Sequence, residues 1–256
     1  KFDEQNAQGD SANCTTICNQ FVSSNVDLIL GNGTAALQAA YTNTDKIPVL
    51  GTSITDYATA LDIKDWTGVS NMNVSGTSDL APLEEQAKML NEIFPDAKNV
   101  GILYCSAEAN SKYQADTITP FLEKFGYKVS SYTFSDSNDI AAIAKDACDK
   151  NDVLYIPTDN TAANNTGIIN NIAIAAKTPI IAGEEGICNG CGVATLSISY
   201  YDLGYATGEM AYEILAEGAD ITTMDVRYAP NVTKKYNAKI CEELGITVPD
   251  DYVAIQ

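Results

Sequence analysis

Short apolar runs alternate with longer amphipathic stretches along the whole chain. The runs have the length of buried β-strands, and the stretches repeat apolar residues at helical spacing. The predicted strands are residues 26–30, 47–51, 99–105, 128–134, 152–156, 179–182 and 193–198. The predicted helices are residues 12–24, 35–42, 79–94, 111–125, 139–150, 161–177, 202–217 and 232–244. Apolar strands between helices indicate an α/β fold with parallel sheets that are covered on both faces.

A passage without a predicted strand, residues 65–76, divides this alternation into two blocks. We expect it to be a crossing between two lobes, with a second crossing at residues 197–201. On this prediction, residues 1–70 and 200–225 form the first lobe, and residues 71–199 form the second. Residues 226–256 then form a C-terminal segment that returns across the hinge.

Local signals agree with these helix boundaries. Asp79 stands shortly before Pro82, so we expect it to be the acidic cap of a helix that begins there. Gly126 and Gly218 each follow a predicted helix directly, at the position where glycine commonly ends a helix.

The charge of the chain limits its partners. It carries 34 acidic and 15 basic residues, and its formal net charge is −19. Nucleic acid binding requires Lys and Arg to neutralise phosphates, so we expect no nucleic acid partner and no polyanionic ligand. A zwitterion or a neutral metabolite is compatible with this charge. No apolar run has the length of a membrane-spanning helix, which predicts a soluble mature chain that a lipid anchor could still hold.

The residues that most often carry catalysis or bind metals are few. The sequence has no histidine, which excludes Ser-His-Asp and Cys-His sites and most catalytic zinc sites. Its seven cysteines include two close pairs, Cys14 with Cys18 on one helix face and Cys188 with Cys191 in a loop. Four thiolates could hold zinc, but we prefer a short disulfide or reduced thiols. We therefore predict neither a metal nor a cofactor.

Polar loops follow five of the predicted strands. In open α/β sheets, ligands bind beyond the carboxyl ends of the strands, where loops run into helix N-termini. The loops are residues 31–36, 52–57, 106–111, 157–160 and 183–186. The first is a Gly-rich turn without the Lys of a phosphate-binding loop, so it offers N–H groups to a carboxylate rather than to a nucleotide. Together these loops would line a cleft for a polar small molecule.

The residue types in the loops suit an amino acid. Helix N-termini and hydroxyl groups would bind its carboxylate, and an acid would bind its ammonium group. Asp159 is the first choice for that acid, followed by Asp56 and Glu184, and each could equally be the N-cap of the helix that follows it. Two acids could also serve glycoside hydrolysis, but no particular pair is marked out in the sequence.

Several motifs resemble the ABC transporter substrate-binding proteins of the tryptophan/tyrosine-binding lipoprotein type. The resemblance spans nearly the whole chain in the expected order. It is carried by residues 5–10 (QNAQGD), 27–36, 47–49, 55–56, 67–70 (TGVS), 104–106, 108, 110–111, 157–160 (PTDN) and 200–204 (YYDLG).

The resemblance implies a fold of the type I periplasmic-binding-protein kind, with two Rossmann-like lobes joined by hinge crossings. It implies a bacterial cell-surface lipoprotein or periplasmic protein that binds tyrosine, phenylalanine or tryptophan between its lobes by hinge closure. The expected partner is the permease of an ABC importer, and the expected protein is a monomer without catalytic activity. The implied ligand-binding residues are Thr34, Ala35, Ser53, Asp56, Glu108, Asn110, Ser111, Asp159, Asn160 and Glu184. Tyr57, Tyr113 and Tyr200 are further candidates for stacking on the ligand ring.

The beginning of the chain departs from the family pattern. Family members carry a first strand–helix unit before the QNAQ segment at residues 5–8. We expect the whole protein to contain this unit, because its absence would leave a slot with unpaired backbone groups in the first sheet.

Three other functions stay open at this point, and one of them, a structural or adhesive role at the cell surface, could coexist with ligand binding. A ligand-sensing domain of the same fold would share every feature described so far. An enzyme that uses carboxylates on a small polar substrate is the second alternative, which the absence of histidine disfavours.

Overall fold

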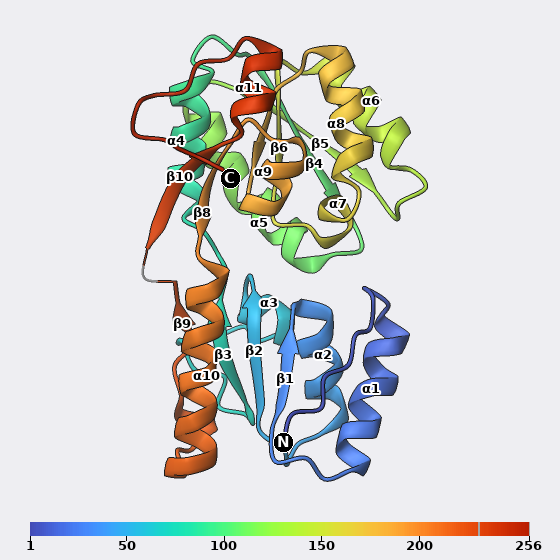
Figure 1. The fold of residues 1–256 in the computed structure, drawn as a ribbon, viewed down its shortest axis with the longest axis vertical. Helices are drawn as coiled ribbons and strands as arrows, with labels where there is room; N and C mark the ends of the chain where they lie inside the picture. Colours follow the sequence, from blue (N-terminus) through green and yellow to red (C-terminus); the bar gives the residue numbers. More distant parts are fainter. Residues whose placement is uncertain (230, 256) are drawn as a thin grey trace. The chain divides into compact units, whose positions relative to one another are not determined.

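The computed structural model describes residues 1–229 and 231–255, which form two compact units (Figure 1). The first unit comprises Lys1–Leu80 and residues 199–229, and the second comprises Ala81–Ile198 and residues 231–255. The chain thus leaves the first unit after Leu80, whereas the predicted first lobe ended at residue 70. In the described ranges, no helix has both the length and the apolar character that a membrane span requires.

The first unit is built on a four-stranded parallel sheet in the order β1-β2-β3-β9. Its strands are β1 (Ile29–Asn32), β2 (Val49–Ile54), β3 (Val74–Ser78) and β9 (Arg227–Tyr228). Its helices are α1 (Ser11–Ser23), α2 (Thr34–Asn43), α3 (Tyr57–Leu61) and α10 (Tyr200–Glu217), with the 3₁₀ turn η1 (Ile221–Thr223). The predicted α/β class with parallel strands is confirmed.

Both faces of this sheet are covered by helices. Val49 and Leu50 are adjacent in β2 and fully buried, so they point to opposite faces. Val49 packs in a core with residues of α1, α2 and α3, whereas Leu50 packs against Met210 of α10 and Ile221 of η1. Because side chains on both faces of β2 are buried, the strand begins with consecutive apolar residues instead of alternating apolar and polar ones.

Strand β3 corrects the prediction of a crossing at residues 65–76. Its sequence, VSGTS, looks like a polar connection, yet every residue in it is buried. The Ser75 hydroxyl donates to the Met224 carbonyl at 3.0 Å, and the Thr77 hydroxyl lies 2.8 Å from that of Thr207. These partners come from the far end of the sequence, so hydroxyl groups can replace apolar side chains inside the unit.

Strand β1 lies at an edge of the described four-stranded sheet. β1 and β2 pair directly, with Ile29 opposite Val49. The Ile29 N–H donates to the Pro48 carbonyl at 3.0 Å, and the Gly33 N–H donates to the Thr52 carbonyl at 2.9 Å. The four described strands are therefore hydrogen-bonded to one another in order, and the further strand–helix unit expected before residues 5–8 stays a prediction.

The second unit holds a seven-stranded sheet in the order β11-β10-β8-β7-β6-β4-β5, in which only the β8–β10 pair is antiparallel. Its strands are β4 (Asn99–Cys105), β5 (Lys128–Phe134), β6 (Val153–Ile156), β7 (Ile180–Ala182), β8 (Ala194–Ile198), β10 (Val232–Tyr236) and β11 (Val253–Ala254). Its helices are α4 (Leu83–Ile93), α5 (Ala109–Lys124), α6 (Ile140–Lys150), α7 (Asn160–Ala163), α8 (Thr166–Ala176), α9 (Glu185–Cys191) and α11 (Ala238–Leu244).

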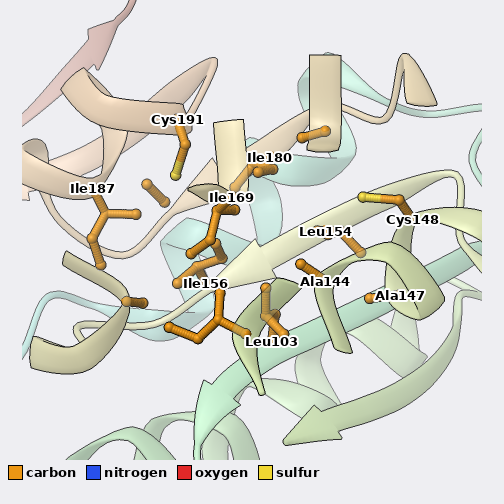
Figure 2. Close-up of a cluster of buried hydrophobic side chains, with 14 of the residues drawn as sticks. Leu103, Ala144, Ala147, Cys148, Leu154, Ile156, Ile169, Ile180, Ile187 and Cys191 are labelled. Carbon is orange, nitrogen blue, oxygen red and sulfur yellow. The ribbon is translucent and has the colours of Figure 1, made fainter. Parts of the chain in front are cut away.

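One face of this sheet packs against α6, α8 and α9 (Figure 2). Leu103, Leu154 and Ile156 contribute from the strands, and Ile169 and Ile187 contribute from the helices. All of them are fully buried. Helices α4 and α5 contact the sheet through β8, β4 and β5. This second apolar contact explains the continuous apolar sequence of the central strands.

Two predicted helices differ from the structure. Residues 232–244 form strand β10 followed by α11, because Asn237 accepts a hydrogen bond from the Ile240 N–H and starts the helix there. Residues 161–177 are split into α7 and α8, with Asn164 and Asn165 between them.

The cysteines are packing residues in this structure. All seven are buried and reduced, and the Cys188–Cys191 pair lies in α9 rather than in a loop. Burial raises the pKa of the Cys191 thiol to about 12 and that of Cys188 well above its ordinary value. These thiols therefore stay protonated near neutral pH and act as small apolar side chains.

Candidate functional site

In the first unit, the loop after β1 leads into the N-terminus of α2. Gly33 is the N-cap with φ of +90°, a left-handed conformation that favours glycine, and no side chain caps the helix. Thr34 is buried and Ala35 is exposed in the first turn. The first N–H groups of a helix have no partner within it, so this end of α2 can bind an anion.

The loop after β2 places Ser53 and Asp56 differently. Ser53 has φ of +56° and lies where the pairing of β2 with β3 shifts register. The Asp56 carboxylate accepts the Thr59 N–H at 2.7 Å and caps α3. Tyr57 is 2% exposed and stacks on Trp66 with ring centroids 6.2 Å apart, so its ring belongs to the core.

Asp79 is a buried acid at the end of β3 that sequence reasoning assigned to another role. It does not cap α4, whose N-cap is Pro82. Instead its carboxylate accepts the Thr55 hydroxyl at 3.0 Å and the Tyr200 hydroxyl at 3.2 Å. Recognising β3 as a strand would have revealed Asp79 as a residue at the ligand-binding edge, like the other candidate acids.

In the second unit, Glu108 is surrounded by donors at the N-terminus of α7. It accepts Asn160 N at 2.9 Å, Asn160 Nδ2 at 2.8 Å, and both the N–H and the hydroxyl of Thr161 at 2.8 Å. Asn110 Nδ2 adds a longer bond of 3.3 Å. Burial opposes ionisation of Glu108, but the bonds from Asn160 and Thr161 outweigh it and lower the pKa of this carboxyl.

Asp159 is the most deeply buried of the predicted acids, with 1% of its surface exposed. One carboxylate oxygen accepts the Cys105 N–H at 2.7 Å, and the other accepts the Ala162 N–H at 2.7 Å as the N-cap of α7. Burial, followed by the negative charge of Glu108, raises the pKa of Asp159 to about 6 despite these two bonds. A positive group beside Asp159 would reverse this effect.

Asn110 and Ser111 both bind the backbone of the neighbouring loop. The Asn110 amide and the Ser111 hydroxyl each donate to the Thr158 carbonyl at 3.2 Å. The candidates in residues 106–111 and 157–160 therefore form one hydrogen-bonded cluster, as the parallel order of β4 and β6 requires. Tyr113, a candidate for ring stacking, is partly buried in α5.

Glu184 caps α9 at the third loop of the second unit. It accepts the Gly186 N–H at 2.6 Å and the Ile187 N–H, and burial raises its pKa. The buried Gln86 of α4 stabilises this loop, because its amide donates to the Gly183 carbonyl at 3.0 Å. Gly183 itself packs so closely on the Thr158 backbone that an added Cβ would lie 2.7 Å from Thr158 N.

The loops of the two units differ in chemistry. The loops of the first unit offer uncapped N–H groups, hydroxyls and the Asp56 carboxylate. Those of the second unit offer the carboxylates of Glu108, Asp159, Glu184 and Glu185, of which Glu185 pairs with Lys235. None of the five predicted loops contains Lys or Arg. Within residues 1–229 and 231–255, no three His, Cys, Asp or Glu side chains are grouped to hold a metal ion. The N–H groups of the first unit can bind an anion, and the carboxylates of the second unit can bind a cation.

Known proteins resemble the chain over nearly its whole length. A tyrosine-binding protein of Clostridioides difficile (strain R20291) is 37% identical over 230 residues, which are 88% of this chain and 66% of that protein. This chain thus spans slightly less than two thirds of that relative's length.

Two solved structures superpose on the chain. The ABC domain from Streptococcus pneumoniae in complex with L-tryptophan is 32% identical, with a TM-score of 0.92 over 98% of this chain and 84% of that one. The ligand-free, open structure of a substrate binding protein with adhesive properties from Clostridium difficile is 35% identical. Its TM-score is 0.74 over 99% of this chain and 86% of that one. These overlaps confirm the predicted periplasmic-binding-protein fold.

The family assignment agrees with this geometry. Residues 1–255 match the family described as ABC transporter substrate binding protein. The members compared above are binding proteins rather than enzymes. The chain belongs to the ABC transporter substrate binding protein family.

Proposed function

We propose that this chain binds a free aromatic amino acid and delivers it, unchanged, to the permease of an ABC importer. The observation that carries the proposal is a pair of complementary groups, neither of which meets a side chain of opposite charge. α2 begins with N–H groups that no side chain caps, and Asp159 is a buried acid without a basic neighbour in the described part of the chain. An amino acid supplies both missing charges.

In this proposal, the ligand carboxylate binds at Thr34 and Ala35, with Ser53 beside them. The ammonium group binds Asp159, which has unused lone pairs because each of its oxygens accepts one N–H. Glu108 accepts five hydrogen bonds and is less available. Asp159 is thus the better partner for a cation.

The aromatic class of ligand is supported by the relatives. One related protein is described as tyrosine-binding, and another was solved with L-tryptophan. The remaining ring candidates, Tyr113 and Tyr200, are both partly exposed and could pack on an aromatic side chain. We propose that these two rings contact the ligand. We exclude Tyr57 from this role because its ring stacks on Trp66 in the core.

The proposed binding mechanism is a population shift. Because the two charged groups of the ligand are assigned to different units, the ligand favours the conformation in which both units contact it. The ligand-bound conformation is what a permease would recognise. We propose that the protein acts as a monomer outside the cytoplasmic membrane, where a lipid anchor would keep it near the permease.

The first test is thermal unfolding of the refolded, ligand-free protein with each of the twenty amino acids. A ligand at a hundredfold excess over its dissociation constant stabilises the folded state by about 2.7 kcal/mol. We expect a clear rise in Tm with one or more of tyrosine, tryptophan and phenylalanine. Tyramine lacks the carboxylate and desaminotyrosine lacks the ammonium group, so both should bind much more weakly. An unchanged Tm with every amino acid would refute the proposal.

A further inference from the structure

Gln114 is a buried glutamine of α5 whose side chain binds the backbone of a single residue outside its helix. Its Nε2 donates to the Thr158 carbonyl at 3.2 Å, and its Oε1 accepts the Thr158 N–H at 3.2 Å. Only 2% of its surface is exposed. The Gln114 amide thus hydrogen-bonds both the N–H and the carbonyl of Thr158, as the backbone of a neighbouring strand would.

Thr158 lies where the strand pairing has ended. The register of β6 with β4 ends at Tyr155, opposite Ile102. Beyond it, three side chains of α5 donate to the Thr158 carbonyl, each at 3.2 Å: Asn110, Ser111 and Gln114. Gln114 alone among these three also accepts the Thr158 N–H. It therefore fixes both the position and the orientation of this peptide backbone.

The next residue is Asp159, so the position of Thr158 determines where this carboxylate lies. Its oxygens meet the Cys105 N–H and the Ala162 N–H, each at 2.7 Å. The other groups that act on it are the Glu108 carboxylate and the Ser111 hydroxyl, together with the Cys105 thiol beside it. A shift of Thr158 would lengthen the two short bonds, while Glu108 would continue to repel the charge.

We propose that Gln114 is a positioning residue that sets where the Asp159 carboxylate meets the ammonium group of the ligand. This inference rests on the proposed function. Gln114 itself does not contact the ligand. It acts through Thr158, and it makes the second unit ready to bind an ammonium group before the ligand arrives.

The test is the substitution Gln114→Met, which keeps the size of the side chain but can neither donate nor accept these bonds. The matched control is Gln38→Met in the first unit, where the Gln38 amide donates to the Ala60 carbonyl at 3.0 Å. Affinity for the aromatic amino acid found by thermal unfolding is measured by calorimetry between about pH 4 and about pH 8. The same pH series gives the unfolding free energy of each ligand-free protein with and without Asp159→Asn.

We expect Gln114→Met to weaken binding at neutral pH about tenfold, the equivalent of about 1.4 kcal/mol. Because looser N–H bonds stabilise the ionised form less, the pH midpoint of binding and of the Asp159 titration should both move upward. In the Asp159→Asn background, Gln114→Met should change affinity little, since the residue through which it acts has lost its charge. Gln38→Met should lower stability without moving either midpoint.

The inference is overturned if Gln114→Met only lowers stability and leaves affinity and both midpoints unchanged. An equal loss of affinity with and without Asp159→Asn would overturn it too. If the unsubstituted protein binds no amino acid, the proposed function fails separately. The ligand-free titration then still decides whether Gln114 positions the Asp159 carboxylate.

Discussion

The Tyr200 hydroxyl donates a hydrogen bond of 3.2 Å to the Asp79 carboxylate, although the two residues are 121 positions apart. Asp79 stands just before the chain leaves the first unit at Leu80, and Tyr200 stands just after it returns at Ser199. The bond therefore joins the two places where the chain passes between units. The same carboxylate accepts the Thr55 hydroxyl, which connects this point to the loop after β2.

Tyr200→Phe removes this hydrogen bond and keeps the ring. We expect the free energy of unfolding to fall by about 1 kcal/mol, the usual net contribution of such a bond, because Asp79 retains the bond from Thr55. Urea denaturation of both proteins measures the change. The control is Tyr201→Phe at the neighbouring residue, which is 81% exposed and should be neutral. Equal effects of the two substitutions would show that the Tyr200 hydroxyl does not stabilise the unit.

Asp159→Asn tests the proposed ammonium partner. The substitution removes the charge but keeps a side chain that can cap a helix. A hydrogen bond to a charged group contributes about 1.5–3 kcal/mol, so affinity for the amino acid should fall by about tenfold to a hundredfold. Calorimetry measures this loss. The matched control is Asp10→Asn at the N-cap of α1, which should leave affinity unchanged. Undiminished binding by Asp159→Asn would move the ammonium site to another acid.

Ligand affinity should depend on pH through the ionisation of Asp159. Burial and Glu108 raise the pKa of Asp159 from 3.8 to about 6 in the folded protein. An ammonium group needs the ionised form, so affinity should be high at neutral pH and fall as the pH drops below about 6. Calorimetry over this range shows the decline, and the Asp159→Asn protein should lack it.

The contribution of Asp159 to the stability of the ligand-free protein should fall as the pH rises, whereas ligand affinity should increase. The folded state holds a proton on Asp159 more tightly than the unfolded state does, so this acid becomes destabilising as the pH rises from 3.8 to about 6. Glu108 has a lowered pKa and contributes the reverse trend. Subtracting the unfolding free energy of Asp159→Asn isolates the contribution of Asp159. A flat difference across this range would contradict the raised pKa.

Gly183→Ala tests the contact between the loops that carry Asp159 and Glu184. The new Cβ would lie 2.7 Å from Thr158 N, a backbone atom that cannot move away cheaply. We expect a loss of about 1–3 kcal/mol in stability, as for other overpacked sites, together with weaker ligand binding. Gly167→Ala in α8 is the control, since nothing lies within 4 Å of its added Cβ. It should stabilise the helix by about 0.5 kcal/mol and leave binding unchanged.

Much of the fold could be predicted from the sequence because the central strands are buried on both faces. β4 and β5 have the predicted bounds, residues 99–105 and 128–134. Their apolar character is required wherever helices cover a parallel sheet, whatever the details of packing. The loops that hold the candidate residues could be predicted for a related reason, since parallel strands bring their carboxyl ends to one edge.

The tertiary structure alone decided which polar residues are internal. β3 reads as a connection in the sequence because Ser75 and Thr77 are hydrophilic, and they become a buried strand only through Met224 and Thr207. Asp79 was predicted to be a helix cap because its hydrogen-bond partner, Tyr200, is distant in the sequence and only the fold brings the two together.

The sequence by itself determined the class of fold, the central strands of the second sheet and the loops in which most of the candidate acids lie. It could not determine which acid is left to bind a cation, because each candidate acid stands at a position where it could be the N-cap of the following helix. Glu108 is satisfied by Asn160 and Thr161, more than fifty residues away. Asp159 is buried beside that charge, and no basic side chain of the described residues acts on it. Only folding brings these groups together, since pKa values and hydrogen-bond partners depend on distances that the order of residues does not contain.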